Sequence, residues 1–147
     1  MSQIKLAFIA SQDETALQAK RELENKYPHV PENDADVVVV LGGDGNMLEA
    51  LRYYIDKPVK VSGMNKGTVG FLMNEFSSDN LLKRIEAATL VTLHPLRMHV
   101  ETSTGIVKEA LAFNEVSLLR ETSQTAKLRI TIDGTCLLYT SDAADEP

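Results

Sequence analysis

The sequence predicts an α/β fold in which a doubly wound, mostly parallel sheet flanked by helices is followed by the start of an antiparallel β domain. Three observations predict it. First, short apolar runs alternate with segments of helical period over residues 1–95. Second, one of these runs is continuously apolar, which is typical of a central parallel strand. Third, from Val91 the hydrophobic period changes from about 3.6 to about 2 residues. We therefore expect an α/β domain at 1–95 and the start of a β-rich domain at 96–134.

The first elements are a strand, a helix and a second strand. Ile4–Ala10 is short, apolar and followed by polar residues, which predicts a mostly buried strand. Apolar residues then recur at helical spacing from Ala16 to Tyr27, and Pro28 ends the run. Val37–Leu41 is continuously apolar and β-branched, as expected of a central parallel strand that is covered on both faces.

A glycine-rich break follows this central strand. After Gly42–Gly45, helical spacing resumes over residues 46–54, and we expect Asn46 as the N-cap with Glu49 as its capping-box partner. A third strand, Val59–Val61, opens into a second glycine-rich stretch at residues 63–72.

The remaining elements are a helix and several strands. Ser78 is expected to cap a helix that runs to about Ala88. Alternating residues then predict a strand at 98–102, and further strands are expected at Ala110–Leu119 and Leu128–Ile132.

The end of the chain does not continue this pattern. Asp133-Gly134 is a hairpin turn signal, but we expect no partner strand after it. The residues from Cys136 to Glu146 resemble translated sequencing-adapter read-through. We therefore expect 135–147 to be a non-native or disordered tail, and the chain to be a truncated fragment.

The composition is that of one globular domain. The chain has 147 residues, of which 44% are hydrophobic and 24% charged, and its formal net charge is −6. An acidic chain disfavours nucleic acid as a partner. Because the sequence has no run of about 18 apolar residues and no signal peptide, we expect no membrane association and a cytoplasmic location. Cys136 is a lone cysteine, so no internal disulfide is expected.

The strongest functional signal is the Gly-Gly-Asp-Gly sequence. It leaves a buried strand at the sheet edge where open α/β folds bind ligands, and its glycines let backbone approach a phosphate closely. Gly42, Gly43 and Gly45 are therefore candidate phosphate-loop residues. Asp44 would repel phosphate, which predicts a proton acceptor, a partner for a sugar hydroxyl or a cation ligand. A role in turn geometry alone is equally open.

The second signal is Asn114-Glu115 within the apolar stretch expected to form a strand. Burying an amide and a carboxylate there costs a few kcal/mol unless both find partners. Ribose hydroxyls or base edges would satisfy them, and a solvated edge or a bulge is the alternative.

Other candidate groups are weaker. Neither a Walker A motif nor the dinucleotide fingerprint occurs, which disfavours ordinary dehydrogenase chemistry. Lys66 and Arg97 are candidates for steering phosphate, although a lone basic residue in a loop is more simply solvated. The histidines have no acid or nucleophile at a readable spacing.

Four segments together, in order and spacing, resemble the N-terminal half of the bacterial NAD kinase family. They are Gly42–Gly45, Gly63–Phe76, His94–Arg97 and Asn114–Arg120. Gly-Gly-Asp-Gly alone also occurs in diacylglycerol kinases, sphingosine kinases and phosphofructokinases, whereas the combination is specific. The likeness extends from Ile4 to about Gly134.

The resemblance implies an enzyme that phosphorylates the 2′-hydroxyl of the adenosine ribose of NAD to make NADP. It implies ATP or polyphosphate as the phosphate donor, a divalent metal such as Mg²⁺, NAD and ATP as partners, and a homo-oligomer for the full-length protein. It also implies Asp44 as the catalytic proton acceptor, with Gly45, Phe71, Asn114 and Glu115 binding NAD.

Two alternatives remain open. The first is a nucleotide-binding module without catalysis, because the family's second domain completes the site and the isolated chain is expected to be inactive. The second is a lipid kinase of the diacylglycerol kinase type, which the absence of a basic amphipathic helix disfavours.

Overall fold

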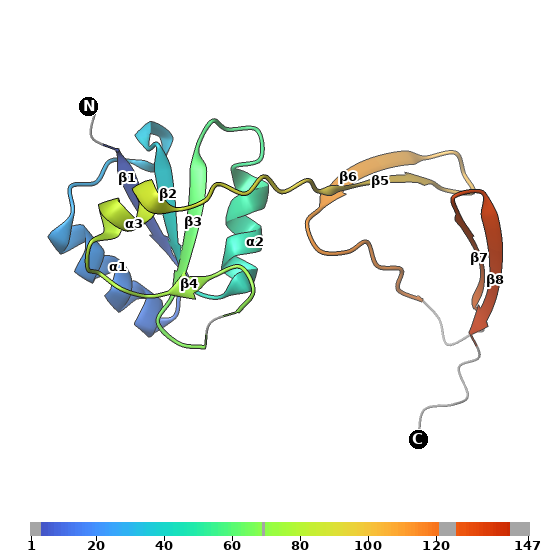
Figure 1. Cartoon of the computed structure of the whole chain (residues 1–147). Helices are drawn as coiled ribbons and strands as arrows, with labels where there is room; N and C mark the ends of the chain where they lie inside the picture. Colours follow the sequence, from blue (N-terminus) through green and yellow to red (C-terminus); the bar gives the residue numbers. More distant parts are fainter. Residues whose placement is uncertain (1–3, 69, 121–125, 142–147) are drawn as a thin grey trace, which may run out of the picture. The chain divides into compact units, whose positions relative to one another are not determined.

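The chain folds as two units, residues 1–94 and 95–147. The computed structural model, drawn in Figure 1, describes residues 4–68, 70–120 and 126–141. The candidate loop that contains Asp44 belongs to the first unit, and the candidate pair Asn114 and Glu115 belongs to the second.

A four-stranded parallel sheet forms the centre of the first unit. Its strands lie in the order β1 (Leu6–Ala10), β2 (Val37–Leu41), β3 (Lys60–Asn65) and β4 (Asn74–Glu75). Every neighbouring pair is parallel, and Val37 of β2 lies opposite Leu6 on one side and Lys60 on the other. All five residues of β2 are buried, as the continuous apolar run predicted.

Helices cover both faces of this sheet, which confirms the predicted α/β class. Helices α1 (Glu14–Lys26) and α3 (Leu81–Ala87) pack on one face, while α2 (Asp44–Tyr53) packs on the other. A short 3₁₀ helix, η1 (Glu32–Asp34), precedes β2. Within the parts of the chain that the structure describes, no helix is long and apolar enough to cross a membrane.

Side chains alternate along each strand, so the two helical layers cover two separate apolar clusters. Leu23 of α1 contacts the cluster that includes Val37, Val39 and Leu41, whereas α2 packs on the cluster that includes Val38 and Val40. The sheet is therefore the middle of three layers.

The two helical crossovers have opposite hands. Both β1–α1–β2 and β2–α2–β3 step one strand in the same direction across the sheet, yet their helices lie on opposite faces. One of the two is therefore left-handed, an arrangement found in only about 2% of such connections. As a result, the chain leaves β1 and β2 toward opposite faces, which opens a crevice at the carboxyl ends of these strands.

The start of α3 differs from the prediction that Ser78 caps it. The helix begins at Leu81, after Asn80 in a left-handed conformation with φ of 53°. The Tyr27 hydroxyl donates to the Ser78 carbonyl at 2.7 Å and accepts from the Leu81 N–H at 3.1 Å. A side chain from the end of α1 therefore satisfies the first free amide of α3, and the Ser78 prediction is wrong.

Tyr54 connects the α2 layer to η1. The residue is buried, and its hydroxyl donates to Glu32 Oε2 at 2.6 Å. Burial, followed by this hydrogen bond, raises the pKa of Tyr54 above that of a free tyrosine.

The raised pKa predicts that the first unit loses stability in alkaline solution. The unfolded chain releases the Tyr54 proton at about pH 10, whereas the folded chain retains it. The stabilisation that protonated Tyr54 gives to the folded state is thus complete below about pH 10. As the pH rises further, the free energy of unfolding falls by at most about 1.4 kcal/mol per pH unit on account of this group. Urea unfolding at several pH values should show a shallower alkaline slope for Tyr54→Phe than for wild type. Tyr53→Phe, at the exposed neighbouring tyrosine, is the control. Equal slopes for wild type and Tyr54→Phe would contradict the assignment of the alkaline loss of stability to Tyr54.

The described strands of the second unit form two antiparallel hairpins. Strand β5 (Leu96–Glu101) pairs with β6 (Val107–Ala112), and β7 (Ala126–Ile132) pairs with β8 (Thr135–Ser141). The expected change to antiparallel β structure is confirmed.

Strand β6 is shorter than the predicted strand at Ala110–Leu119. Its last paired residue is Ala112, opposite Leu96. The residue before Leu96 is Pro95, and proline is depleted in strands. Asn114 and Glu115 therefore lie beyond the strand rather than within it.

The expectation that no strand pairs after Asp133-Gly134 is wrong. Both turn residues have positive φ, 48° and 83°, as a two-residue type I′ hairpin turn requires. Residues 135–141 return along β7 as β8. That residues 135–147 are non-native sequence stays a prediction. Residues 142–147 lie outside the described residues.

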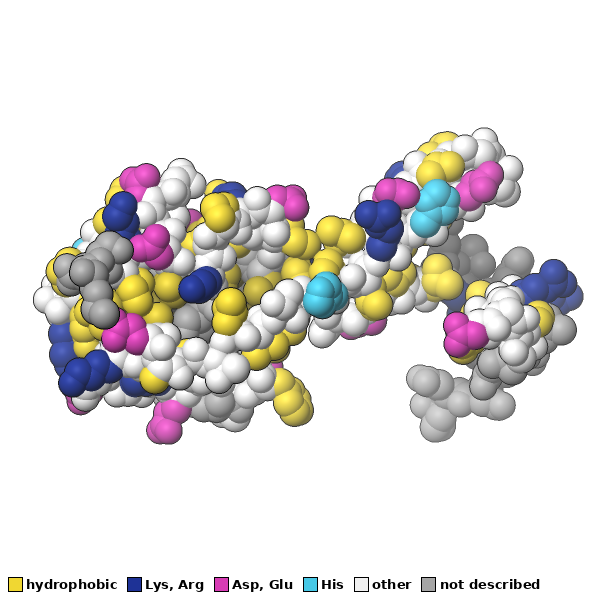
Figure 2. All heavy atoms as spheres, turned by 45° about the horizontal axis from the view of Figure 1, so that its top comes forward, with side chains coloured by type: hydrophobic (Ala, Val, Ile, Leu, Met, Phe, Trp, Pro, Cys, Tyr) yellow, Lys and Arg dark blue, Asp and Glu magenta, His cyan; other side chains and the backbone are white. Residues whose placement is uncertain are grey.

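No described side chain of the second unit is buried. Apolar side chains are visible on its surface in Figure 2. Of the described apolar side chains in this unit, Leu118 is 81% and Leu119 93% exposed. A two-stranded hairpin alone is marginally stable in water. The described hairpins therefore lack the buried apolar contacts that stabilise the first unit.

Candidate active site at the carboxyl ends of the strands

The Gly-Gly-Asp-Gly loop begins where β2 ends. The Gly42 N–H donates to the Met64 carbonyl of β3 at 3.2 Å, and Gly42 has φ of 150°. A β-carbon at this position would lie 2.5 Å from Asn46 Oδ1. Both the backbone conformation and the close approach therefore require glycine at residue 42.

Helix α2 begins two residues earlier than predicted. Gly43 is the N-cap and Asp44 is the first helical residue, while Asn46 Oδ1 accepts from the Gly43 N–H at 3.2 Å. Asn46 thus acts from inside the helix rather than as its cap, and the proposed capping box with Glu49 is wrong. The reason is that glycine serves as an N-cap without a side chain, so the helix includes Asp44. An acidic residue in the first turn also interacts favourably with the helix dipole.

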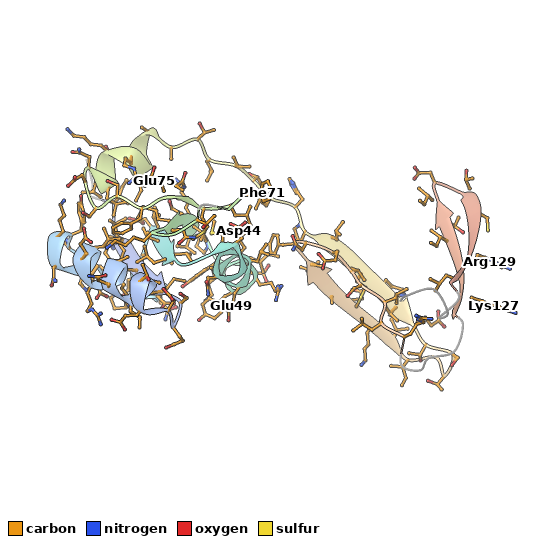
Figure 3. All side chains as sticks on the ribbon, turned by 90° about the horizontal axis from the view of Figure 1, so that it is seen from below. Asp44, Glu49, Phe71, Glu75, Lys127 and Arg129 are labelled. Atoms are coloured by element: carbon orange, nitrogen blue, oxygen red, sulfur yellow. The ribbon has the colours of Figure 1, made fainter. Side chains whose placement is uncertain are left out.

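The Asp44 carboxylate is held by two backbone amides of the segment between β3 and β4. The Phe71 N–H donates to Oδ2 at 2.8 Å, and the Leu72 N–H donates to Oδ1 at 3.1 Å. Figure 3 shows Asp44 and Phe71 near one another, from α2 and from this segment. An ionised carboxylate accepts about four hydrogen bonds, so acceptor capacity remains on both oxygens. The geometry orients the group and leaves it able to accept a proton.

Phe71 contributes to this arrangement through its backbone. Its side chain is fully exposed within the first unit. The predicted role of the ring in an adenine pocket stays a prediction.

A cavity of about 260 Å³ lies at the carboxyl ends of β1, β2 and β3, at the crevice that the diverging chain opens. Gly42 and Gly43 contribute its wall after β2, and Lys66 and Gly67 contribute its wall after β3. Its other polar side chains are Ser11, Asp13, Thr15, Asn46 and Asn65. The cavity is thus lined by the glycine-rich loop and by hydrogen-bonding groups, which suits a polar ligand.

Lys66 is the one basic side chain among the described residues that line this cavity. Its Nζ lies 3.3 Å from Glu22 Oε2 and 5.0 Å from the centre of the Phe76 ring. A hydrogen bond with Ser78, and then the contact with Lys66, hold the pKa of Glu22 below its usual value. A lone loop lysine is expected to be simply solvated, whereas the structure places Lys66 at the candidate site.

Asn114 and Glu115 follow β6 in the second unit, and both are exposed there. The prediction that they lie within a strand is therefore wrong, and their role in binding a ligand stays a prediction. Their convergence with Asp44 on one ligand stays a prediction.

The described residues do not fit a resident metal site. No group of three His, Cys, Asp or Glu side chains among them is placed to hold an ion. Mg²⁺ in phosphoryl-transfer sites is commonly bound through one or two carboxylates together with substrate phosphates, and the rest of its shell is water.

Comparison with known proteins identifies the family. The sequence profile of the ATP-NAD kinase N-terminal domain matches residues 2–91. An NAD kinase of Hyphomonas neptunium is 51% identical over 134 residues, which cover 91% of this chain and 52% of that protein. NAD kinases of Brucella suis and Caulobacter vibrioides are 50% and 51% identical, over 89% and 88% of this chain and 51% and 50% of their own lengths.

The chain thus spans about half the length of the curated relatives it matches. The matched profile includes all four strands of the parallel sheet, the Gly42–Gly45 loop and the residues that hold Asp44. The sequence matches and the three-layer α/β structure agree, and the chain belongs to the NAD kinase family.

Proposed function

We propose that the full-length protein transfers a phosphoryl group to the 2′-hydroxyl of the adenosine ribose of NAD and so makes NADP. The observation that carries this proposal is the oriented, partly exposed Asp44 carboxylate. Asp44 directly follows Gly42 and Gly43, which line the polar cavity at the carboxyl ends of the strands, although Asp44 itself does not line it. Membership of the NAD kinase family, and relatives named NAD kinase at about half identity, support the choice of reaction.

Asp44 is the proposed proton acceptor. As the 2′-oxygen forms its bond to the terminal phosphorus of the donor, one oxygen of Asp44 takes the hydroxyl proton, and the bond to the leaving phosphate oxygen breaks. The two backbone N–H groups keep this carboxylate in place while it acts.

The glycine-rich loop is the proposed phosphate-binding element. Gly42, Gly43 and Gly45 have no side chains that would keep a phosphate away from their backbone, and α2, which begins at Asp44, would direct the positive end of its dipole toward it. ATP or polyphosphate is the proposed donor. A divalent cation that enters with the donor would neutralise the charge of the phosphates.

The remaining site residues come from the family resemblance. We propose that Gly45, Phe71, Asn114 and Glu115 contact NAD, with Asn114 and Glu115 hydrogen-bonding to it. We also propose a cytoplasmic, homo-oligomeric full-length enzyme.

Phosphate transfer assays on the full-length protein test this function. NAD with ATP or with polyphosphate is expected to give a product that a NADP-specific dehydrogenase reduces, whereas diacylglycerol is expected to give none. Phosphorylated diacylglycerol without NADP would support the lipid kinase alternative instead. The isolated 147-residue chain is expected to make no detectable NADP.

Lys66 is expected to bind the phosphate donor, because it is the one basic group of the described cavity lining. We predict that Lys66→Met raises the KM for ATP by about tenfold, the effect of losing roughly 1.4 kcal/mol of binding, and changes kcat by less than threefold. Lys57→Met is the control, since Lys57 stacks on Tyr53 and does not line the cavity. Equal KM values for the two variants would rule out this role for Lys66.

A further inference from the structure

Gly70 lies directly against the Asp44 carboxylate. A β-carbon built on Gly70 would stand 2.5 Å from both Cγ and Oδ1 of Asp44, and it would also collide with Oδ2. Side-chain carbons do not approach other heavy atoms this closely without displacement. Only a residue without a side chain therefore leaves the carboxylate in its observed position.

This close approach permits the two hydrogen bonds that follow in the chain. The N–H groups that hold the carboxylate belong to Phe71 and Leu72, the two residues immediately after Gly70. Each donates to a different oxygen of Asp44, which fixes the plane of the group as well as its position. A carboxylate moved by a β-carbon at Gly70 would lose the alignment of at least one of these bonds.

We propose that Gly70 is a positioning residue for phosphoryl transfer, which acts by letting the Phe71 and Leu72 amides orient the proton acceptor Asp44. This inference rests on the proposed function. It assigns to the segment between β3 and β4 a role in the rate of the reaction that is separate from ligand binding. A displacement of about 1 Å of a catalytic group is enough to cost about 10²-fold in rate.

The substitution Gly70→Ala is suited to test this role because the atoms it displaces are the end of a side chain. The Asp44 carboxylate is able to rotate away with little cost to the fold. Gly63 provides the contrast, since a β-carbon there would collide with Met73 Sδ and lie 3.2 Å from Met47 Sδ in the buried α2 layer. We expect Gly63→Ala to lower stability, and Gly70→Ala to lower the rate with the melting temperature nearly unchanged.

The experiment is a double-mutant cycle in the full-length protein, with kcat and KM for NAD measured for each variant. Gly70→Ala is expected to lower kcat by about 10²-fold and to change KM by less than threefold. In an Asp44→Asn background the same substitution is expected to lower kcat by less than about threefold, because the group it positions is already lost. Thr68→Ala, an exposed change in the same segment, is the control.

The outcomes separate the positioning role from the proposed function. The role of Gly70 would be overturned if Gly70→Ala left kcat within twofold of wild type, or if it lowered kcat equally in the wild-type and Asp44→Asn backgrounds. In either case, NADP formation by the wild-type protein would still support the proposed function. A wild-type protein that forms no NADP would overturn both. NMR spectra of this chain report the contact without turnover, since Gly70→Ala should shift the amide protons of Phe71 and Leu72, whereas Thr68→Ala should not. Unchanged amide shifts in Gly70→Ala would also overturn the proposal.

Discussion

Replacing Asp44 by asparagine in the full-length protein is expected to lower kcat for NADP formation by about 10²–10⁴-fold, the usual contribution of a general base. Asparagine is nearly isosteric but does not take up the hydroxyl proton. Its NH₂ group would also face one of the two backbone N–H donors, so one hydrogen bond to Phe71 or Leu72 would be lost. A coupled assay that follows NADP measures the rate, and a thermal melt checks that the variant is folded.

Asp56→Asn is the matched control for this prediction. Asp56 is exposed just beyond the end of α2, so the same loss of charge there should leave kcat within twofold of wild type. Wild-type turnover by a folded Asp44→Asn protein would remove Asp44 from the mechanism. A similar loss in both variants would point to net charge rather than to a base.

The second large effect is expected at Leu23, whose side chain is fully buried between α1 and the sheet. Truncation to alanine removes apolar contacts and leaves a cavity, which costs about 2–5 kcal/mol at buried leucines. Urea denaturation of this chain, followed by far-ultraviolet circular dichroism, should show a markedly lower midpoint for Leu23→Ala.

Leu90→Ala serves as the control, because Leu90 is 68% exposed. This change should alter the free energy of unfolding by less than about 0.5 kcal/mol, as expected at surface positions. Equal losses for the two substitutions would mean that α1 does not pack on the sheet as described.

The sequence is sufficient to predict the layers and the position of the candidate base. Val37–Leu41 is long enough, apolar enough and β-branched enough to be recognised as the central strand, so the loop after it has to lie at the carboxyl edge of the sheet. The amino-acid pattern alone therefore places Asp44 beside a ligand-binding edge.

Capping and strand ends are predicted less well, because distant residues determine them. The amide at the start of α3 is satisfied by Tyr27, which is 54 positions away from Leu81 in the sequence. Strand β6 ends at Ala112, whose last partner is Leu96, 16 positions earlier in the sequence. The pattern of neighbouring residues in the sequence shows neither the contact of Tyr27 with Leu81 nor the pairing that ends β6.

The same limit applies to the candidate site. The hydrogen bonds that orient Asp44 come from residues 27 and 28 positions later, and the only local signal for them is a glycine-rich segment. The opposite hands of the two crossovers, which open the crevice, contradict the usual rule and are not encoded in any short motif.

A crystal structure of the full-length protein with NAD bound tests most directly whether Asp44 and the later Asn114-Glu115 pair act on one ribose. We expect an Asp44 carboxylate oxygen within about 3 Å of the 2′-hydroxyl, with Asn114 or Glu115 hydrogen-bonded to the same nucleotide. NAD bound elsewhere, or a ribose that contacts the Asn114-Glu115 pair while Asp44 lies out of reach, would contradict the proposed mechanism.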